Sequence, residues 1–151
     1  KGPWLTVFTF SKAYAMAGMR IGYALCSDGE LAQALQKTTC VFNVPILAQY
    51  AGEAALNDID YLDFILENTA TGRTQIFEGL KELGLDPIPS VGNFVSCPVP
   101  INGRDCMTAM LEKNVQINAW ADAGYENHIR ITVGTEEDNA ACLAALKEVL
   151  A

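Results

Sequence analysis

Hydrophobic positions in the first part of the chain predict two strands followed by two helices. Residues 4–10 (WLTVFTF) are aromatic, β-branched or apolar almost throughout, which is typical of a strand buried on both faces. Residues 20–26 predict a second short strand, and the Ser-Asp-Gly turn at 27–29 caps a helix over 30–38. A second apolar-periodic run begins at a proline and covers 45–56, as a helix does.

The remainder of the chain predicts helices that alternate with short strands. Apolar residues recur at helical spacing from 61 to 83, and Gly84 ends this pattern. Within 88–100, β-branched residues bounded by prolines predict a strand. Further along, the pattern predicts a helix over 103–114, strands over 115–120 and 128–134, and a helix over 136–150. This order is typical of a small α/β or α+β lobe.

Composition and charge narrow the classes of function. The 151 residues are 50% hydrophobic and 19% charged, which excludes disorder and suits a globular enzyme. Ten Lys and Arg against eighteen Asp and Glu give a net charge of -8, which argues against a nucleic-acid or anionic-membrane surface. No apolar run suits a membrane-spanning helix and no leader is evident, so we expect a cytoplasmic protein. The five scattered cysteines predict free thiols and neither disulfides nor a metal site.

The stretch TFSKAYAMAGMRIG, residues 9–22, carries the strongest candidate chemistry. Lys12 follows an apolar strand, so we expect its amine to be desolvated, uncharged and reactive toward a carbonyl. Thr9 and Ser11 lie two residues apart and present hydroxyls on one side, and Arg20 offers a bidentate fork for an oxyanion. Together they predict a phosphate pocket beside a reactive amine, whereas Lys12 taken alone would suit a solvated surface.

Residues 9–15 (TFSKAYA) and 17–22 (AGMRIG) resemble the cofactor-lysine motif of fold-type I pyridoxal-phosphate enzymes. The likeness is to the class I/II aminotransferases, and closest to the histidinol-phosphate aminotransferase family. It implies that Lys12 holds pyridoxal 5'-phosphate through its amine and moves a proton during the reaction. It also implies that Ser11 and Arg20 bind the cofactor phosphate, and the Thr9 hydroxyl is placed to join them.

Two further segments resemble the same family. Residues 128–139 (HIRITVGTEEDN) resemble its RITVGT segment, which implies that Arg130 binds the substrate α-carboxylate. Asn93 resembles the asparagine of an NF strand near the substrate, although a turn or strand-end role is equally open. Where the family usually reads G-[VI]-[IL]-V-R, this chain has NVQIN, so Asn118 replaces an arginine that grips a substrate phosphate. Histidinol phosphate is therefore in doubt as a substrate, and an aromatic or otherwise uncharged amino acid becomes a candidate substrate.

The resemblance covers the C-terminal two-fifths of a family member. It implies that residues 1–57 complete the large cofactor-binding domain of an α/β protein and that residues 58–151 form its small domain. It also implies a homodimeric aminotransferase that exchanges an amino group between an amino acid and a 2-oxo acid such as 2-oxoglutarate. We expect this segment alone to be inactive. A decarboxylase of the same fold and a non-catalytic regulatory module remain the alternatives.

Overall fold

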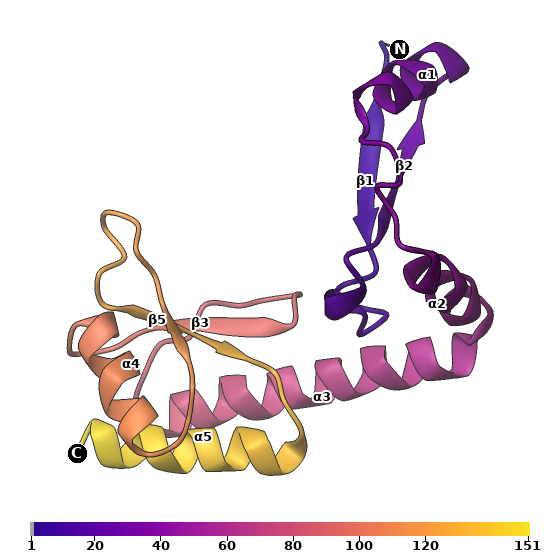
Figure 1. The fold of residues 1–151 in the computed structure, drawn as a ribbon. Coiled ribbons are helices and arrows are strands. Elements are labelled where there is room, and N and C mark those ends of the chain that lie inside the picture. Colours follow the sequence, from indigo (N-terminus) through magenta and orange to yellow (C-terminus); the bar gives the residue numbers. More distant parts are fainter. Residues whose placement is uncertain (1) are drawn as a thin grey trace. The chain divides into compact units, whose positions relative to one another are not determined.

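The computed structural model describes residues 2–151, and Lys1, where the expected large-domain segment begins, lies outside them. The described chain forms two compact units that divide between Leu66 and Glu67. Helices and strands occur in both, which confirms the expected α/β class. In chain order (Figure 1) the elements are β1 (Leu5–Thr9), η1 (Ala17–Met19), β2 (Gly22–Cys26), α1 (Gly29–Thr38), α2 (Ile46–Asn57), α3 (Ile59–Glu82), β3 (Phe94–Pro98), α4 (Gly103–Glu112), β4 (Asn118–Ala119), β5 (His128–Thr132) and α5 (Glu136–Val149).

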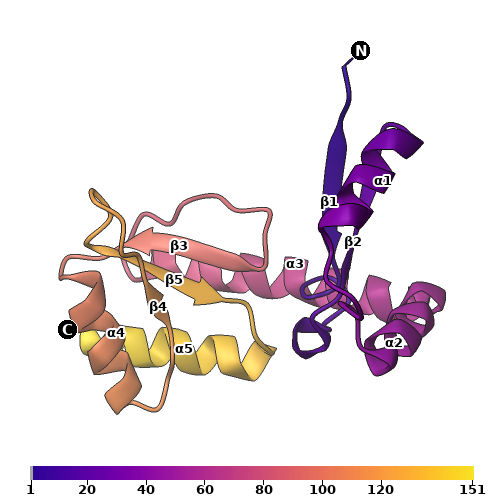
Figure 2. The ribbon, with the colours of Figure 1, turned by 45° about the horizontal axis from the view of Figure 1, so that its top comes forward.

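The first unit is built on an antiparallel pair of strands. β1 and β2 pair in register from Leu5 opposite Cys26 to Thr9 opposite Gly22, and α1 lies against β2 (Figure 2). The expectation that the first strand is buried on both faces is wrong for this chain, because every residue of β1 is exposed. Within residues 2–151, β1 pairs with β2 alone, and no described helix packs on the pair closely enough to bury the side chains of β1.

The helices of the first unit begin as the sequence predicts. Asp28 caps α1 by accepting a hydrogen bond from the Leu31 N–H at 2.9 Å. This bond, together with one from the Ser27 hydroxyl, lowers the pKa of the Asp28 carboxyl below its usual range. Pro45 precedes the first turn of α2, where its missing N–H is not needed.

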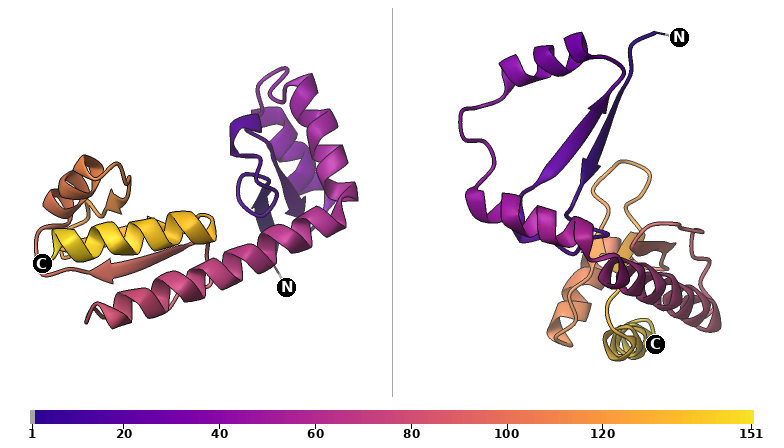
Figure 3. Two further views of the ribbon diagram at one scale, coloured as in Figure 1. Left: turned by 90° about the horizontal axis from the view of Figure 1, so that it is seen from below. Right: turned by 90° about the vertical axis from the view of Figure 1, so that its right-hand side faces the viewer.

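The second unit has a sheet layer and a helix layer. Its strands are antiparallel in the order β3-β5-β4, so β5 is the central strand. Side chains on one sheet face pack against α3, α4 and α5, and Figure 3 shows α5 beside α3 under the sheet. The fully buried residues of this core are Ile76, Leu80, Val95, Cys97, Cys106, Met110, Ile129 and Leu146. Because alternate residues of a strand point to opposite faces, the other face is left for different side chains.

Local sequence signals set the ends of the helices in the second unit. Gly84 has φ +77°, a left-handed conformation that ends the helical segment after α3. Thr135 and Asp138 form a reciprocal capping box at the start of α5. The strand expected over 115–120 is much shorter than predicted, because only β4 pairs with β5 there. No described helix is long and apolar enough to cross a membrane.

The boundary between the units lies inside α3. The sequence places a domain boundary after residue 57, before this helix begins, whereas packing assigns residues 58–66 to the first unit. α3 thus begins in one unit and continues into the other. The identification of residues 1–57 and 58–151 with the large and small domains of a complete enzyme stays a prediction.

Candidate functional site

The loop over residues 10–21 leaves and re-enters the strand pair at one end. Thr9 lies opposite Gly22, and beyond this pair the Phe10 N–H donates to the Ile21 carbonyl at 3.2 Å. Gly22 is required at this position, because a Cβ would lie 2.5 Å from a backbone carbonyl oxygen of β1. The two ends of the loop, which carry the predicted cofactor-binding residues, are therefore held together by the backbone.

Two hydroxyls meet where β1 ends. The Thr9 hydroxyl donates to the Ser11 Oγ at 2.8 Å, and it accepts a hydrogen bond from the Ser11 N–H at 3.1 Å. These bonds fix the chain as it turns out of the strand. The structure therefore brings together two of the residues that the sequence predicts for phosphate binding, with both oxygens at the base of the loop.

Arg20 closes the other end of the loop in a strained backbone conformation. Its φ is +53°, in the left-handed region that non-glycine residues seldom adopt. Its Nη1 donates to the Ala17 carbonyl at 2.8 Å, which ties the side chain to η1. In residues 2–151 no carboxylate forms an ion pair with Arg20, so the cation is available to an anionic ligand. Strain of this kind persists where surrounding structure imposes it, and it often accompanies function.

Lys12 lies at the tight turn of the same loop. Its carbonyl accepts a hydrogen bond from the Ala15 N–H at 2.9 Å. The expected desolvation is not found, because Lys12 is exposed in the described chain. The physical reason is the one that applies to β1, namely that few described residues pack over this end of the strand pair. No acid pairs with Lys12 among the residues described.

In the second unit, Arg130 occupies the centre of the sheet face opposite the core. On β5 it lies between Ser96 of β3 and Asn118 of β4. Directly opposite residues of antiparallel strands point to the same face, so these three side chains form a row across the sheet. Ile129 and Ile131, its neighbours in sequence, point the other way into the core.

Aromatic rings hold the Arg130 guanidinium. Its Cζ lies 5.3 Å from the centroid of the Phe94 ring and 5.7 Å from that of the Trp120 ring, which are cation–π distances. The Arg130 Nε is buried without a hydrogen-bond partner among the described residues. An unpaired buried donor is costly, so an acceptor from a ligand would stabilise this arrangement.

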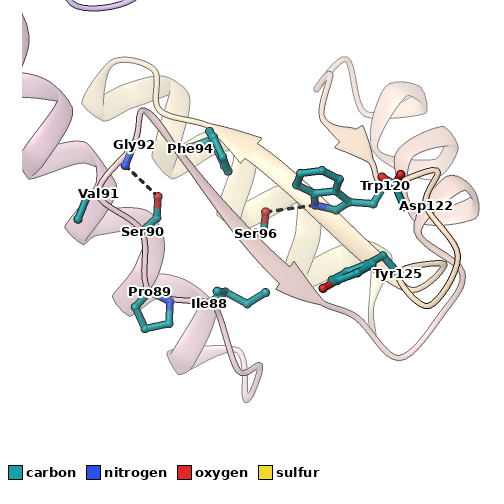
Figure 4. A pocket seen from close by; sticks show the side chains of 10 residues that line it. All are labelled: Ile88, Pro89, Ser90, Val91, Gly92, Phe94, Ser96, Trp120, Asp122 and Tyr125. Carbon is teal, nitrogen blue, oxygen red and sulfur yellow. Dashed lines mark hydrogen bonds between the residues drawn. The ribbon is translucent and has the colours of Figure 1, made fainter. Parts of the chain in front are cut away.

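A cavity of about 600 Å³ opens on this face of the second unit (Figure 4). Its lining residues are Ile88, Pro89, Ser90, Val91, Gly92, Phe94, Ser96, Trp120, Asp122 and Tyr125. The Trp120 Nε1 donates to the Ser96 Oγ at 3.2 Å, so the tryptophan is attached to β3 across the sheet. Arg130 does not line the cavity itself, but it lies against two of the rings that do.

The structure places Asn93 next to this region without showing a side-chain role. Its carbonyl accepts a hydrogen bond from the Val133 N–H at 2.9 Å, which extends the pairing of β3 with β5 by one step. Asn93 is not among the cavity lining. Asn93 therefore directly precedes Phe94 and continues the line of β3. Its contact with a substrate stays a prediction.

Several residues of this face were not assigned to the site from the sequence. Short sequence motifs do not assign Phe94, Ser96, Trp120 or Tyr125 to the site. The alternation of core and non-core residues along β3 and β5 is the signal that points to the first two. The ring centroid of His128 lies 4.9 Å from that of Tyr125.

Other reactive groups of the described chain do not form a second centre. Burial raises the pKa of the Cys97 and Cys142 thiols to about 11, so both stay protonated near neutral pH. Cys26 and Cys40 are also free thiols. Within residues 2–151, no group of three or more His, Cys, Asp or Glu residues is arranged to hold a metal ion.

Asn139 positions the loop that follows the Arg130 strand. It is buried, and its Oδ1 accepts a hydrogen bond from the Gly134 N–H at 2.9 Å while its Nδ2 donates to the Gln75 Oε1 at 3.0 Å. These bonds join α3, α5 and the end of β5. The loop geometry after Arg130 therefore depends on a single buried amide.

We expect Asn139→Ala to destabilise the protein by about 1–3 kcal/mol, because it leaves buried partners unsatisfied. Urea unfolding of the complete protein measures the effect. Gln116→Ala, at an exposed position of the same unit, is the control and should stay within about 0.5 kcal/mol of the unmodified protein. Equal stability of both variants would show that the Asn139 bonds contribute nothing.

Comparison with known proteins agrees with the geometry of both units. A histidinol-phosphate aminotransferase of Methylococcus capsulatus is 39% identical over 142 residues, which cover 94% of this chain and 38% of that protein. One from Mesorhizobium japonicum is 33% identical over 148 residues, covering 98% and 40%. A crystal structure of histidinol-phosphate aminotransferase from Sinorhizobium meliloti, in complex with pyridoxal-5'-phosphate, superposes with a TM-score of 0.85 at 32% identity, covering 97% of this chain and 40% of that one.

The chain therefore spans about two-fifths of the length of these relatives. The family model that it matches is described as aminotransferase class I and II, and the match runs from residue 1 to residue 146. This extent includes the Ser-Lys loop of the first unit and the Arg130 strand of the second. We conclude that the chain belongs to the class I and II aminotransferase family.

Proposed function

We propose that the complete protein containing this chain is a pyridoxal-phosphate-dependent aminotransferase. The observation that carries the proposal is the segment over residues 9–21, in which the hydrogen-bonded hydroxyls of Thr9 and Ser11, the exposed Lys12 and an Arg20 without a described carboxylate partner follow one end of a strand pair. Membership of the aminotransferase family supports the assignment. The activity belongs to the complete protein, and we expect residues 1–151 alone to be inactive.

The loop suits a cofactor that carries an aldehyde and a phosphate. Thr9 and Ser11 offer hydroxyls for phosphate oxygens, and Arg20 offers a planar fork that is not engaged by a described carboxylate. Lys12, the residue after Ser11, offers a primary amine. When bound, the cofactor withdraws electrons from the Cα of the amino acid.

Each residue of the loop has a separate task in this proposal. The amine of Lys12 would hold the cofactor, and the same amine would carry the proton to and from the substrate Cα. Ser11, Thr9 and Arg20 bind the phosphate and fix the cofactor's position, which in turn fixes the distance over which Lys12 moves the proton. Covering of Lys12 by other residues of the complete protein would favour its uncharged form.

Arg130 is proposed to bind the α-carboxylate of both substrates. Its guanidinium is oriented by two rings, and its buried Nε lacks a partner, so a carboxylate can satisfy it through a two-pronged ion pair. Asn93 is proposed to lie beside the same substrate. A fixed carboxylate orients the Cα–H bond, which the proton transfer requires.

The finer points of the proposal concern partners, location and domains. The substrates are an amino acid and a 2-oxo acid such as 2-oxoglutarate. We propose a cytoplasmic homodimer in which residues 1–57 belong to the large domain and residues 58–151 form the small one. The acidic net charge favours small-molecule substrates over nucleic acid or a membrane surface.

Transfer of labelled nitrogen tests the activity. The complete protein, supplied with pyridoxal phosphate, a set of ¹⁵N-labelled amino acids and 2-oxoglutarate, should form ¹⁵N-glutamate, which mass spectrometry detects. Release of carbon dioxide without labelled glutamate would identify the decarboxylase alternative instead. Absence of both reactions would favour the regulatory alternative and contradict the proposal.

A further inference from the structure

We propose that the cavity on the open sheet face of the second unit receives the substrate side chain and selects an uncharged, aromatic one. This inference rests on the proposed function, because it takes Arg130 as the carboxylate anchor. It goes beyond that function by naming the class of amino acid. The observations that carry it are the chemistry of the cavity walls and the charges around Arg130.

The cavity walls are mainly apolar and aromatic. Phe94 and Trp120 meet the Arg130 guanidinium on one side of the cavity, and Tyr125 lies near Trp120 with ring centroids 6.3 Å apart. Ile88 and Val91 come from the segment before β3 (Figure 4). A volume of about 600 Å³ lies within the range of about 300–1,000 Å³ that small-molecule sites occupy. A phenyl or indole ring attached to a carboxylate therefore matches both the walls and the space.

Charges near the cavity oppose a second anionic group. We take Arg130 as the anchor of the substrate carboxylate, and no arginine or lysine is among the lining residues, all of which are described. Asn118, directly opposite Arg130 on β4, contributes a neutral amide, and Asp122 adds a negative charge at the lining. Arg73 on α3 donates to the Gly92 carbonyl at 2.9 Å, so its guanidinium is held by the backbone beside the lining. A phosphate among the lining side chains would meet the Asp122 carboxylate and no lysine or arginine, so a phosphorylated side chain is disfavoured.

Trp120 forms a fixed wall rather than a mobile one. Its backbone N–H donates to the His128 carbonyl at 3.1 Å, and its indole N–H donates to Ser96 at 3.2 Å. Both ends of the residue are therefore attached to neighbouring strands. A pre-positioned ring loses little conformational freedom when a substrate ring packs on it, which favours aromatic ligands.

Binding of two carboxylates that differ only at the far end tests the proposal. The complete protein, loaded with pyridoxal phosphate, is titrated by calorimetry with 3-phenylpropionate and with 3-phosphonopropionate. We expect at least about tenfold tighter binding of 3-phenylpropionate. Trp120→Ala should weaken it about tenfold or more, whereas Trp120→Phe, which keeps a ring, should restore most of the loss.

Asn118→Arg should shift the ratio of the two dissociation constants by at least about tenfold toward 3-phosphonopropionate, because it places a cation beside Arg130. Thr108→Arg is the matched control. Thr108 is exposed on α4, a helix that packs on the other face of the sheet, so the variant adds the same charge away from the cavity and should leave the ratio of dissociation constants unchanged. Preference of the unmodified protein for 3-phosphonopropionate, or binding of neither ligand, would overturn the inference. Either result can occur while labelled nitrogen is still transferred, so failure of the inference is distinguishable from failure of the proposed function.

Discussion

Replacing Lys12 with alanine is expected to abolish the covalent adduct between the complete protein and pyridoxal phosphate. Borohydride reduces the bond between an amine and the cofactor aldehyde, so the adduct should map to Lys12 by peptide mass spectrometry in the unmodified protein. In the proposed function, the variant loses both the cofactor anchor and the group that moves the proton. The rate of amine transfer should therefore fall by about 10²-fold to 10⁴-fold, which is the usual contribution of a positioned acid or base.

Lys37→Ala is the matched control for this experiment. Lys37 lies in the last turn of α1, in the same unit, and has no predicted role in the loop over residues 10–21. Its variant should keep the adduct and the activity. An adduct of unchanged yield in the Lys12 variant would place the cofactor anchor at another residue and remove the main support for the proposed function.

Replacing Arg130 with lysine is expected to lower kcat/KM for amino acid and 2-oxo acid by roughly 30-fold or more, the usual loss when one partner of a hydrogen-bonded charge pair is removed. Lysine retains the charge, but it lacks the planar fork that two carboxylate oxygens require. It also loses the flat surface that stacks between the rings of Phe94 and Trp120. Steady-state kinetics of the complete protein measure the change, with KM rising for both substrates.

Arg104→Lys is the control for the chemical change itself. Arg104 is exposed on α4, which packs on the core face of the sheet, and its variant should keep the kinetic constants. Unchanged KM values in the Arg130 variant would indicate that the carboxylate binds elsewhere. Cofactor retention in the same samples, measured by the borohydride adduct, separates a loss of substrate binding from a loss of the cofactor.

The order of the elements could be predicted from the sequence because each one has a local signal. Asp28 caps α1 and the Thr135 hydroxyl caps α5, as their positions before apolar-periodic runs indicate. Pro45 marks the start of α2, and Gly84 follows the end of α3. The strand predicted over 115–120 is longer than the observed one, because pairing depends on the partner strand and contact with β5 begins only at Asn118.

From the sequence, candidate site residues can be named where they lie close together in the chain. Ser11 and Arg20 belong to one motif, and the strand register brings their loop ends together. Trp120 could not be assigned in the same way, because its partner Ser96 lies 24 residues earlier and the contact exists only once β3, β5 and β4 pair. Whether Lys12 is buried or exposed could not be predicted either. Desolvation of its amine depends on which residues pack over the loop and not on the apolar strand before it.

The odd-numbered residues of β5 face the core, and the even-numbered residues face the open side of the sheet. Ile129 and Ile131 hold the fold, whereas His128 and Arg130 point to the open face. A substitution at His128 or Thr132 can therefore alter the open face without entering the hydrophobic core. Libraries for directed evolution of the proposed side-chain preference can be confined to these two positions together with Asn118 and Trp120, with Arg130 kept.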